Sequence, residues 1–246
     1  MNHLNDQTIE RLVGIEAQVH YGEPPPPDVP PFVSHVRPSP ILISAPHGTR
    51  TFRNNDREIW HEEDEYTAAM ALLLSERCGT SVIANIWRSD MCDPNWHLEN
   101  QCHYKHQMRK LVSEQNIRWV LDLHGAAETS LGSPTKLVDL GTRKDQHSLD
   151  IQHRDQLREL VEARLGANCV SLDQFSASIP GTITAFCQTE LKIQAVQIEM
   201  KPSVRIPFRR ADASAYSKSG PYSVPGKNIL AMLSALEVFT TYLRKV

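Results

Sequence analysis

The chain lacks the motifs by which many common enzyme classes are recognised. Its 246 residues contain no Walker loop, no Gly-x-Gly-x-x-Gly segment and no Gly-x-Ser-x-Gly segment, which excludes the usual phosphate cradles and the serine-hydrolase elbow. No apolar run approaches the roughly 20 residues that span a bilayer. The N-terminus has neither a basic region nor an apolar core, so no secretory signal is visible. These absences predict a cytoplasmic protein without a membrane partner.

The spacing of the cysteines and the net charge exclude further classes. The five Cys residues are odd in number and scattered, and no two form a Cys-x-x-Cys pair. This pattern predicts reduced thiols rather than a disulfide framework or a Cys-based zinc site. The formal net charge is -3, which argues against a nucleic-acid partner because such surfaces need a basic patch.

What the chain does have is an alternation of short apolar runs with longer amphipathic segments. The predicted strands are residues 40–45, 81–86, 119–123, 136–140, 169–172 (an edge strand) and 194–199. The predicted helices are about 6–20, 62–79, 98–115, 148–165 and 227–244. This order predicts an α/β fold with a mostly parallel central sheet flanked by helices. Residues 1–35 are expected to form an N-terminal helix and Pro-rich connector, and residues 36–246 a single domain.

Two of the predicted strands end at a His-Gly pair. His47 follows the strand at 40–45, and His124 follows the strand at 119–123. Ligands of open α/β sheets lie beyond the carboxyl ends of the strands, so the two imidazoles are expected to meet there. Either His alone could be an ordinary loop residue, but the repeated pattern favours a site. Asp122 lies on the same strand face as His124 and could accept its second ring N–H.

A cluster of acids, Glu62 to Glu65, stands at the predicted start of a helix. Taken alone, an acidic first turn only complements the helix dipole. Together with two histidines, one of these carboxylates would complete a catalytic zinc site with an open position for water. Asp64 and Glu63 are the best candidates, and we favour Asp64. One Zn²⁺ ion per chain is therefore expected.

Three further polar residues follow or end predicted strands. Glu199 ends an otherwise apolar strand, where an unpaired carboxylate is costly to bury. It either pairs with a cation such as Arg205 or, as we favour, acts as the general base and later proton donor of a zinc hydrolase. Arg88 could hold a substrate carboxylate through two parallel hydrogen bonds, with Asn95 as a further donor. A surface ion pair is the alternative for Arg88.

Taken in chain order, these segments resemble the N-formylglutamate amidohydrolase family, which is similar in fold to the zinc carboxypeptidases and aspartoacylases. The resemblance covers roughly residues 40 to 205. It rests on residues 44–48, the acidic stretch before Tyr66, Arg88 with the Asp-Pro-Asn at 93–95, and residues 121–125 and 196–199. It implies that His47, a carboxylate at 62–65 and His124 bind zinc, that Glu199 is catalytic, and that Arg88 and Asn95 bind a substrate carboxylate.

Two positions depart from the family pattern. Gly48 stands where the family usually has Ser after Pro-His, and Trp96 stands where its Asp-x-Asn-Arg motif has Arg. That Arg would help to hold a substrate carboxylate, so its loss argues against N-formylglutamate itself and leaves zinc hydrolase chemistry intact.

The sequence thus predicts a zinc-dependent amidohydrolase that cleaves the amide bond of an N-formyl or N-acyl amino acid, a small substrate that carries a carboxylate. One alternative is a zinc carboxypeptidase or deacylase acting on a peptide or another amide. A second alternative is a binding protein that keeps the fold but not the metal.

Overall fold

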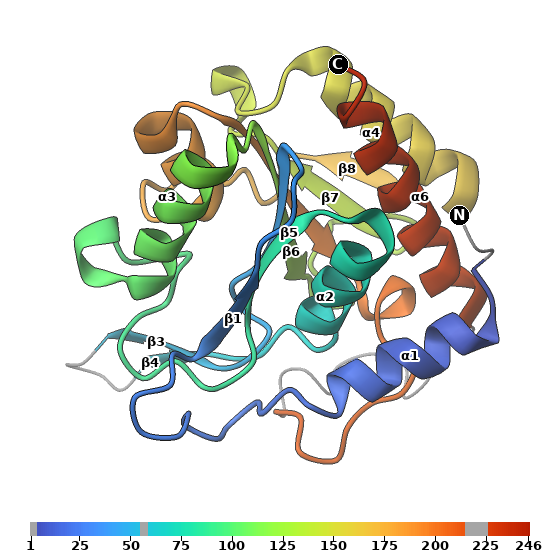
Figure 1. The fold of residues 1–246 in the computed structure, drawn as a ribbon. Helices are drawn as coiled ribbons and strands as arrows, with labels where there is room; N and C mark the ends of the chain where they lie inside the picture. Colours follow the sequence, from blue (N-terminus) through green and yellow to red (C-terminus); the bar gives the residue numbers. More distant parts are fainter. Residues whose placement is uncertain (1–3, 55–58, 215–225) are drawn as a thin grey trace.

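The structure, a computed structural model, describes residues 4–54, 59–214 and 226–246. Its strands are β1 (Phe32–His35), β2 (Ile41–Ala45), β3 (Thr51–Asn54), β4 (Ile59–His61), β5 (Ser81–Asn85), β6 (Trp119–Gly125), β7 (Val138–Gly141), β8 (Val170–Leu172) and β9 (Gln194–Met200). Its α-helices are α1 (Asp6–Glu16), α2 (Thr67–Cys78), α3 (His103–Gln115), α4 (Ile151–Leu165), α5 (Ile183–Phe186) and α6 (Gly226–Leu243) (Figure 1).

A seven-stranded sheet in the order β1-β5-β2-β6-β9-β7-β8 forms the centre of the molecule. The four strands β5, β2, β6 and β9 run parallel, as do β7 and β8, whereas β1 pairs with β5 and β7 with β9 in antiparallel fashion. The predicted α/β fold with a mostly parallel sheet is confirmed. In β2, Ile41 and Ile43 enter one hydrophobic core and Leu42 the other, because neighbouring side chains of a strand point to opposite faces.

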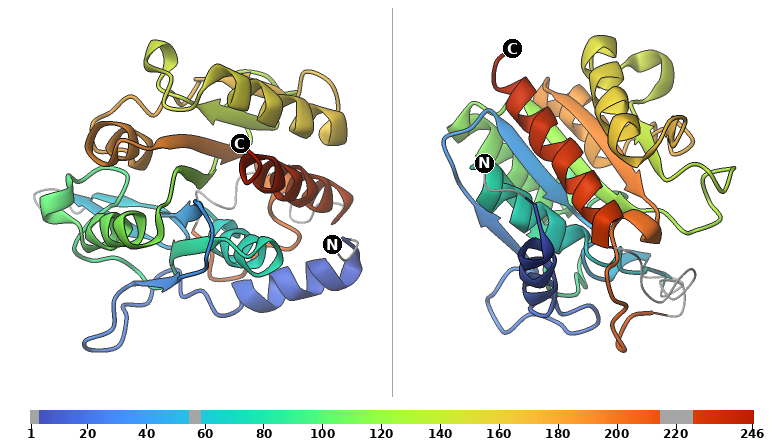
Figure 2. Two further views of the ribbon diagram at one scale, coloured as in Figure 1. Left: turned by 45° about the horizontal axis from the view of Figure 1, so that its top comes forward. Right: turned by 90° about the vertical axis from the view of Figure 1, so that its right-hand side faces the viewer.

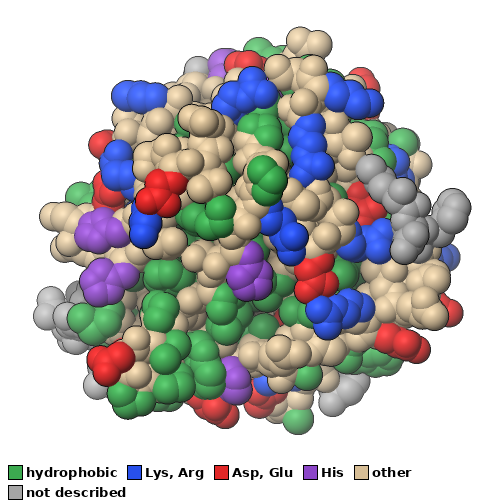
Figure 3. Space-filling model, in the orientation of Figure 1, with side chains coloured by type: hydrophobic (Ala, Val, Ile, Leu, Met, Phe, Trp, Pro, Cys, Tyr) green, Lys and Arg blue, Asp and Glu red, His purple; other side chains and the backbone are tan. Residues whose placement is uncertain are grey.

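Helices cover both faces of this sheet (Figures 1 and 2). Helices α1, α2, α4 and α6 lie on one face, where Leu74 and Phe239 belong to the larger core. Helices α3 and α5 lie on the other, where Tyr104, Met108 and Ile183 form a smaller core with the sheet. None of the helices in the described ranges is long and apolar enough to cross a membrane. The face in Figure 3 carries side chains of both charges, and the basic ones form no continuous field there.

Helix α2 begins later than predicted. It starts at Thr67 and not near residue 62, so the acids at 62–65 lie in the turn before the helix rather than in its first turn. Tyr66, just before the helix, has a left-handed backbone with φ of 67°. The backbone N–H and the hydroxyl of Thr67 both donate to the Asp64 carbonyl, at 3.1 and 2.8 Å. This turn lets successive acids point to different surroundings, which a regular helix would not do.

Several short elements were not predicted. Residues 32–35, assigned to the connector, form β1 at the edge of the sheet. The segment 49–58, expected to be a polar loop, contains β3 and continues into β4, although residues 55–58 lie outside the described residues. Helix α5 was also missed. Each of these elements has only three or four residues, as do β7 and β8, which were predicted, so elements of this length give an uneven signal in the sequence.

A buried carboxylate connects α1 to the segment before α2. Glu16 is 1% exposed and accepts hydrogen bonds from the Tyr21 hydroxyl and from the backbone N–H of Tyr66. Burial raises the pKa of Glu16 to about 7, and the negative charge of Glu65 adds to this, although the two hydrogen bonds and Arg210 act in the opposite direction. The protonated form of Glu16 is therefore favoured by folding.

The stability of the fold should consequently depend on Glu16 between its ordinary pKa of 4.5 and about 7. The native state keeps a proton that the unfolded chain loses, so this contribution is complete below pH 4.5 and disappears as the pH rises through 7. The free energy of unfolding should fall by up to about 3 kcal/mol across that range. Urea unfolding measures this free energy at pH 5 and at pH 8. Its fall between the two pH values should be smaller for Glu16→Gln than for wild type or for Glu10→Gln, a control variant at an exposed position on the same helix. Equal falls in all three proteins would contradict this role.

Candidate metal centre

Three side chains from distant parts of the chain converge at the carboxyl edge of the sheet. His47 follows β2, His124 lies in β6, and Asp64 precedes α2. One ligand atom from each lies within 4.8 Å of the other two, and all three residues are buried. The Nδ1 atoms of both histidines lie 3.5 Å from Oδ2 of Asp64. The structure thus brings together the two imidazoles and the carboxylate that the sequence singled out.

The backbone around His47 explains why these segments meet. The Asp64 backbone N–H donates to the His47 carbonyl at 2.7 Å, which ties the turn before α2 to the end of β2. A Cβ atom added to Gly48 would lie 2.5 Å from both the Asn85 carbonyl oxygen and the Ala68 Cβ. The chain therefore passes between β5 and α2 at a distance that only glycine allows. This close approach accounts for Gly48 where a Ser was expected from the family resemblance.

A buried carboxylate holds the far nitrogen of each histidine. Nε2 of His47 lies 2.8 Å from Oδ1 of Asp93, and Nε2 of His124 lies 2.9 Å from Oδ2 of Asp122. The prediction that Asp122 bonds to His124 is confirmed, whereas the equivalent role of Asp93 was not predicted. A proton on each Nε2 leaves the lone pair of each Nδ1 facing the space beside Asp64, as in histidines that bind metal.

Opposite charges outweigh burial in setting the ionisation of this cluster. Burial alone would lower the pKa of His47 and His124, but Asp93 and Asp64 raise it for His47, and Asp122 and Asp64 raise it for His124. Burial would raise the pKa of Asp64, but the adjacent imidazoles of His124 and His47 bring it well below the usual value. In the absence of a metal, the carboxylates hold protons on the imidazoles.

The donor set fits a divalent metal ion. Nδ1 of His47 is buried and has no hydrogen-bond partner within the described part of the chain, which is costly unless another group binds it. Two imidazole nitrogens and a carboxylate oxygen are typical ligands of catalytic zinc, which keeps a further position open. Glu63, the second candidate ligand, accepts instead from Nε of Arg50 at 3.1 Å and from the backbone N–H of Ser214.

Glu199 lies beside this cluster. It is the register neighbour of His124 in the β6–β9 pair, is 8% exposed, and accepts a hydrogen bond of 2.9 Å from Nε2 of Gln197. Burial raises the pKa of Glu199 to about 7. Arg205 donates instead to the backbone carbonyls of Met200 and Glu65. No ion pair between Glu199 and Arg205 occurs among the described residues, so that alternative is not what the structure shows.

A cavity of about 430 Å³ lies in front of the cluster and is lined by His47, Asp64, His124 and Glu199. Asn95 also lines it: Oδ1 of Asn95 accepts from the backbone N–H of Ile183 at 2.8 Å. The cavity is large enough for a small molecule, and its lining includes the groups that could bind a metal and exchange a proton.

Arg88 lies away from this cavity. Its guanidinium donates to both oxygens of Asp90, at 2.5 and 2.9 Å, and to the Gly22 carbonyl at 3.0 Å. It lines a different hollow, beneath the Pro-rich segment 24–31. An acid two residues along the chain holds the guanidinium in a surface ion pair, which is the alternative that the sequence left open. The position of Arg88 therefore does not support its predicted contact with substrate.

Three of the cavity residues that were not assigned from the sequence contact residues of the candidate site. His61 in β4 stacks on His47 with ring centroids 3.7 Å apart, and burial followed by the charge of His47 lowers its pKa to about 3. Arg53 comes from the unpredicted strand β3. Gln197 was the one residue with a usable signal, since strand alternation places it on the same face as Glu199.

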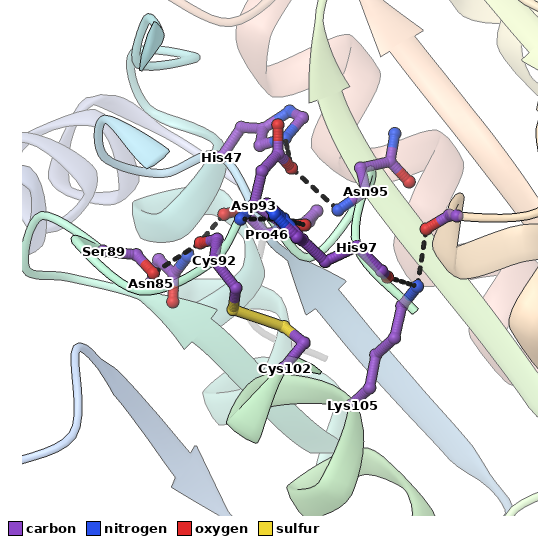
Figure 4. The surroundings of a disulfide bond; sticks show 11 residues. Pro46, His47, Asn85, Ser89, Cys92, Asp93, Asn95, His97, Cys102 and Lys105 are labelled. Carbon is purple, nitrogen blue, oxygen red and sulfur yellow. Dashed lines mark hydrogen bonds and ion pairs between the residues drawn. A yellow bond between two sulfur atoms is a disulfide. The ribbon is translucent and has the colours of Figure 1, made fainter. Parts of the chain in front are cut away.

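A disulfide contradicts the prediction that all cysteines are reduced. Cys92 and Cys102 are bonded, with Cα atoms 5.6 Å apart (Figure 4). Residues ten apart can meet when the chain turns back, so scattered spacing did not exclude a bond. The disulfide closes the loop between β5 and α3 that carries Asp93 and Asn95, which it helps to fix. The prediction of a cytoplasmic location loses the support of reduced thiols.

Comparison with known proteins places the fold. No protein-family model and no curated protein matches the sequence. Among solved structures, N-formylglutamate amidohydrolase from Ralstonia eutropha JMP134 matches with a TM-score of 0.61 and 14% identity, over 88% of this chain and 98% of that one. A bacteriophage poly-gamma-glutamate hydrolase matches with a TM-score of 0.50 and 15% identity, over 86% and 89%.

The LapA aminopeptidase of Legionella pneumophila matches with a TM-score of 0.54 and 9% identity, over 99% of this chain and 71% of that one. All three names are those of hydrolases. Identities this low establish a shared fold and do not establish a shared activity.

Proposed function

We propose that this protein is a zinc-dependent amidohydrolase that cleaves the amide bond of an N-formyl or N-acyl amino acid. The observation that carries the proposal is the convergence of His47, Asp64 and His124 on one buried space, with Glu199 beside it. Hydrolases of the same fold, one of them named for an N-formyl amino acid, support the reaction class. His47, Asp64 and His124 would hold the ion.

A zinc ion supplies Lewis acidity, which activates water and polarises a carbonyl. Glu199 takes a proton from the water as its oxygen adds to the amide carbon. When the carbon–nitrogen bond breaks, Glu199 returns that proton to the departing nitrogen, so the products are a carboxylic acid and a free amine. Gln197 donates to Glu199 and holds the carboxylate in place, and Asn95 can donate to the bound substrate.

The proposal is tested by measuring release of primary amine from a panel of substrates. The purified chain, loaded with one equivalent of Zn²⁺, is given N-formyl and N-acetyl amino acids, short peptides and simple amides. Zinc-dependent release from N-acyl amino acids is expected, with loss of activity after chelation and recovery when zinc is added back. Preferential release from peptides would favour the carboxypeptidase or deacylase alternative. A metal-loaded chain that releases amine from none of these compounds would contradict the proposal and favour a binding protein.

A further inference from the structure

The cavity that holds the candidate metal ligands is also lined by a cation. Arg53 lines it, and among the described residues it is the only Lys or Arg that does so. Nε of Arg53 donates to Oδ2 of Asp93 at 2.5 Å, and its guanidinium carbon lies 5.3 Å from the centroid of the Trp96 ring. The carboxylate and the aromatic ring hold the guanidinium at the wall of the cavity, which limits the entropy lost when it binds a ligand.

Arg53 can bind a second partner while it is paired with Asp93. A guanidinium has five N–H donors, and within the described ranges only the Nε–H of Arg53 has a hydrogen-bond partner, Asp93. The two terminal nitrogens can therefore bind a planar, bidentate partner. The side chain of Arg53 is 29% exposed, so these groups are accessible from the cavity. Carboxylate and phosphate groups match this fork, and the proposed substrate carries a carboxylate.

Large apolar side chains surround the same cavity. Trp96, Phe175 and Ile179 line it and are 49%, 37% and 55% exposed. Single exposed apolar residues are ordinary, but three at the mouth of one cavity form a surface that an apolar group would cover. They belong to two segments in contact, since Gly181 packs so closely on the Trp96 carbonyl that a Cβ atom there would clash with it.

The Arg53 guanidinium and the apolar side chains can each bind a different part of a substrate. We infer that the cavity takes an N-acyl amino acid with a single carboxylate, bound by Arg53, and an apolar side chain, covered by Trp96, Phe175 and Ile179. The inference rests on the proposed function and narrows its substrate class. The position after Asn95 is Trp96 and not Arg, and Arg53 from β3 lies over that ring, so the cation reaches this region from another segment of the chain.

Equilibrium binding tests the inference without turnover. Calorimetry on the zinc-loaded Glu199→Gln protein uses N-formyl-L-leucine, its neutral amide N-formyl-L-leucinamide, and N-formyl-L-glutamate. N-formyl-leucine should bind at least about 10-fold more tightly than either of the other two. Arg53→Met should weaken the binding of N-formyl-leucine by about 10- to 100-fold and leave its amide unchanged, since only the acid offers a charge.

Two matched variants and a metal assay separate recognition from damage. Arg109→Met removes an exposed cation on α3 that pairs with Glu99, and it should change no affinity. Ile179→Ser should weaken the binding of N-formyl-leucine and leave that of N-formyl-glycine unchanged, because only leucine has a side chain that Ile179 can cover. Zinc content should stay at one per chain in all variants, which shows that Asp93 still holds His47.

Equal losses for the acid and the amide in Arg53→Met would overturn the inference, as would tighter binding of N-formyl-glutamate than of N-formyl-leucine, or no binding of any probe. The proposed function fails separately. If the predicted binding pattern appears but the wild-type chain releases no amine from N-formyl-leucine, the ligand class stands and the reaction does not.

Discussion

Replacement of His124 by Ala is expected to lower the affinity of the protein for Zn²⁺ by more than about 100-fold. Loss of a carboxylate that only orients a metal-binding His lowers the metal affinity by about 10- to 100-fold. Removal of the imidazole should cost more, because it takes away the ligand itself. The affinity is measured by competition with a coloured chelator. Asp122→Asn, which keeps the imidazole and weakens its partner, should fall between His124→Ala and wild type.

The controls for this prediction address folding and specificity. His106→Ala removes an exposed His from α3 and should bind zinc as wild type does. Asp64→Asn provides a second test of the site. This substitution keeps the volume of the side chain, so it remains informative if His124→Ala does not fold. Wild-type zinc affinity in both His124→Ala and Asp64→Asn would contradict the assignment of these ligands.

Replacement of Glu199 by Gln should abolish most of the turnover while the metal stays bound. The Gln side chain keeps the shape of Glu199 and can still accept the hydrogen bond from Gln197, but it cannot take a proton from water. A positioned general base contributes about 10²- to 10⁴-fold, so kcat should fall by at least about 100-fold. Steady-state release of amine and zinc content are measured on the same preparation.

Glu190→Gln, an exposed change after α5, is the matched control and should leave both quantities unchanged. The result that counts against the role of Glu199 is a Glu199→Gln protein with wild-type kcat. A loss of zinc together with activity would instead place Glu199 among the groups that bind the metal.

The buried central strands could be predicted from the sequence because each is a run of mostly apolar residues. The strands that end at His47, His124 and Glu199 are apolar because β2, β6 and β9 lie inside the sheet, covered on both faces. The start of α2 was misplaced because acids before a helix and acids in its first turn look alike without coordinates. The turn closed by Thr67 is set by hydrogen bonds to the Asp64 carbonyl.

In the candidate site, some residues could be placed from the sequence and others could not. Segments at the ends of parallel strands must meet, so the meeting of His47 and His124 follows from topology. The partner of an arginine does not follow from topology. Arg88 is held by Asp90 at the surface, whereas Arg53 reaches the cavity from β3, which pairs with β4 and has no clear signal in the sequence.

X-ray absorption at the zinc edge, on the wild-type chain loaded with one equivalent of Zn²⁺, tests the central claim most directly. The account predicts one tightly held zinc per chain, with two imidazole nitrogens and carboxylate oxygen at about 2.0–2.2 Å and no sulfur ligand. A chain that retains no zinc, or whose zinc has fewer than two imidazole ligands or a sulfur ligand, would contradict it.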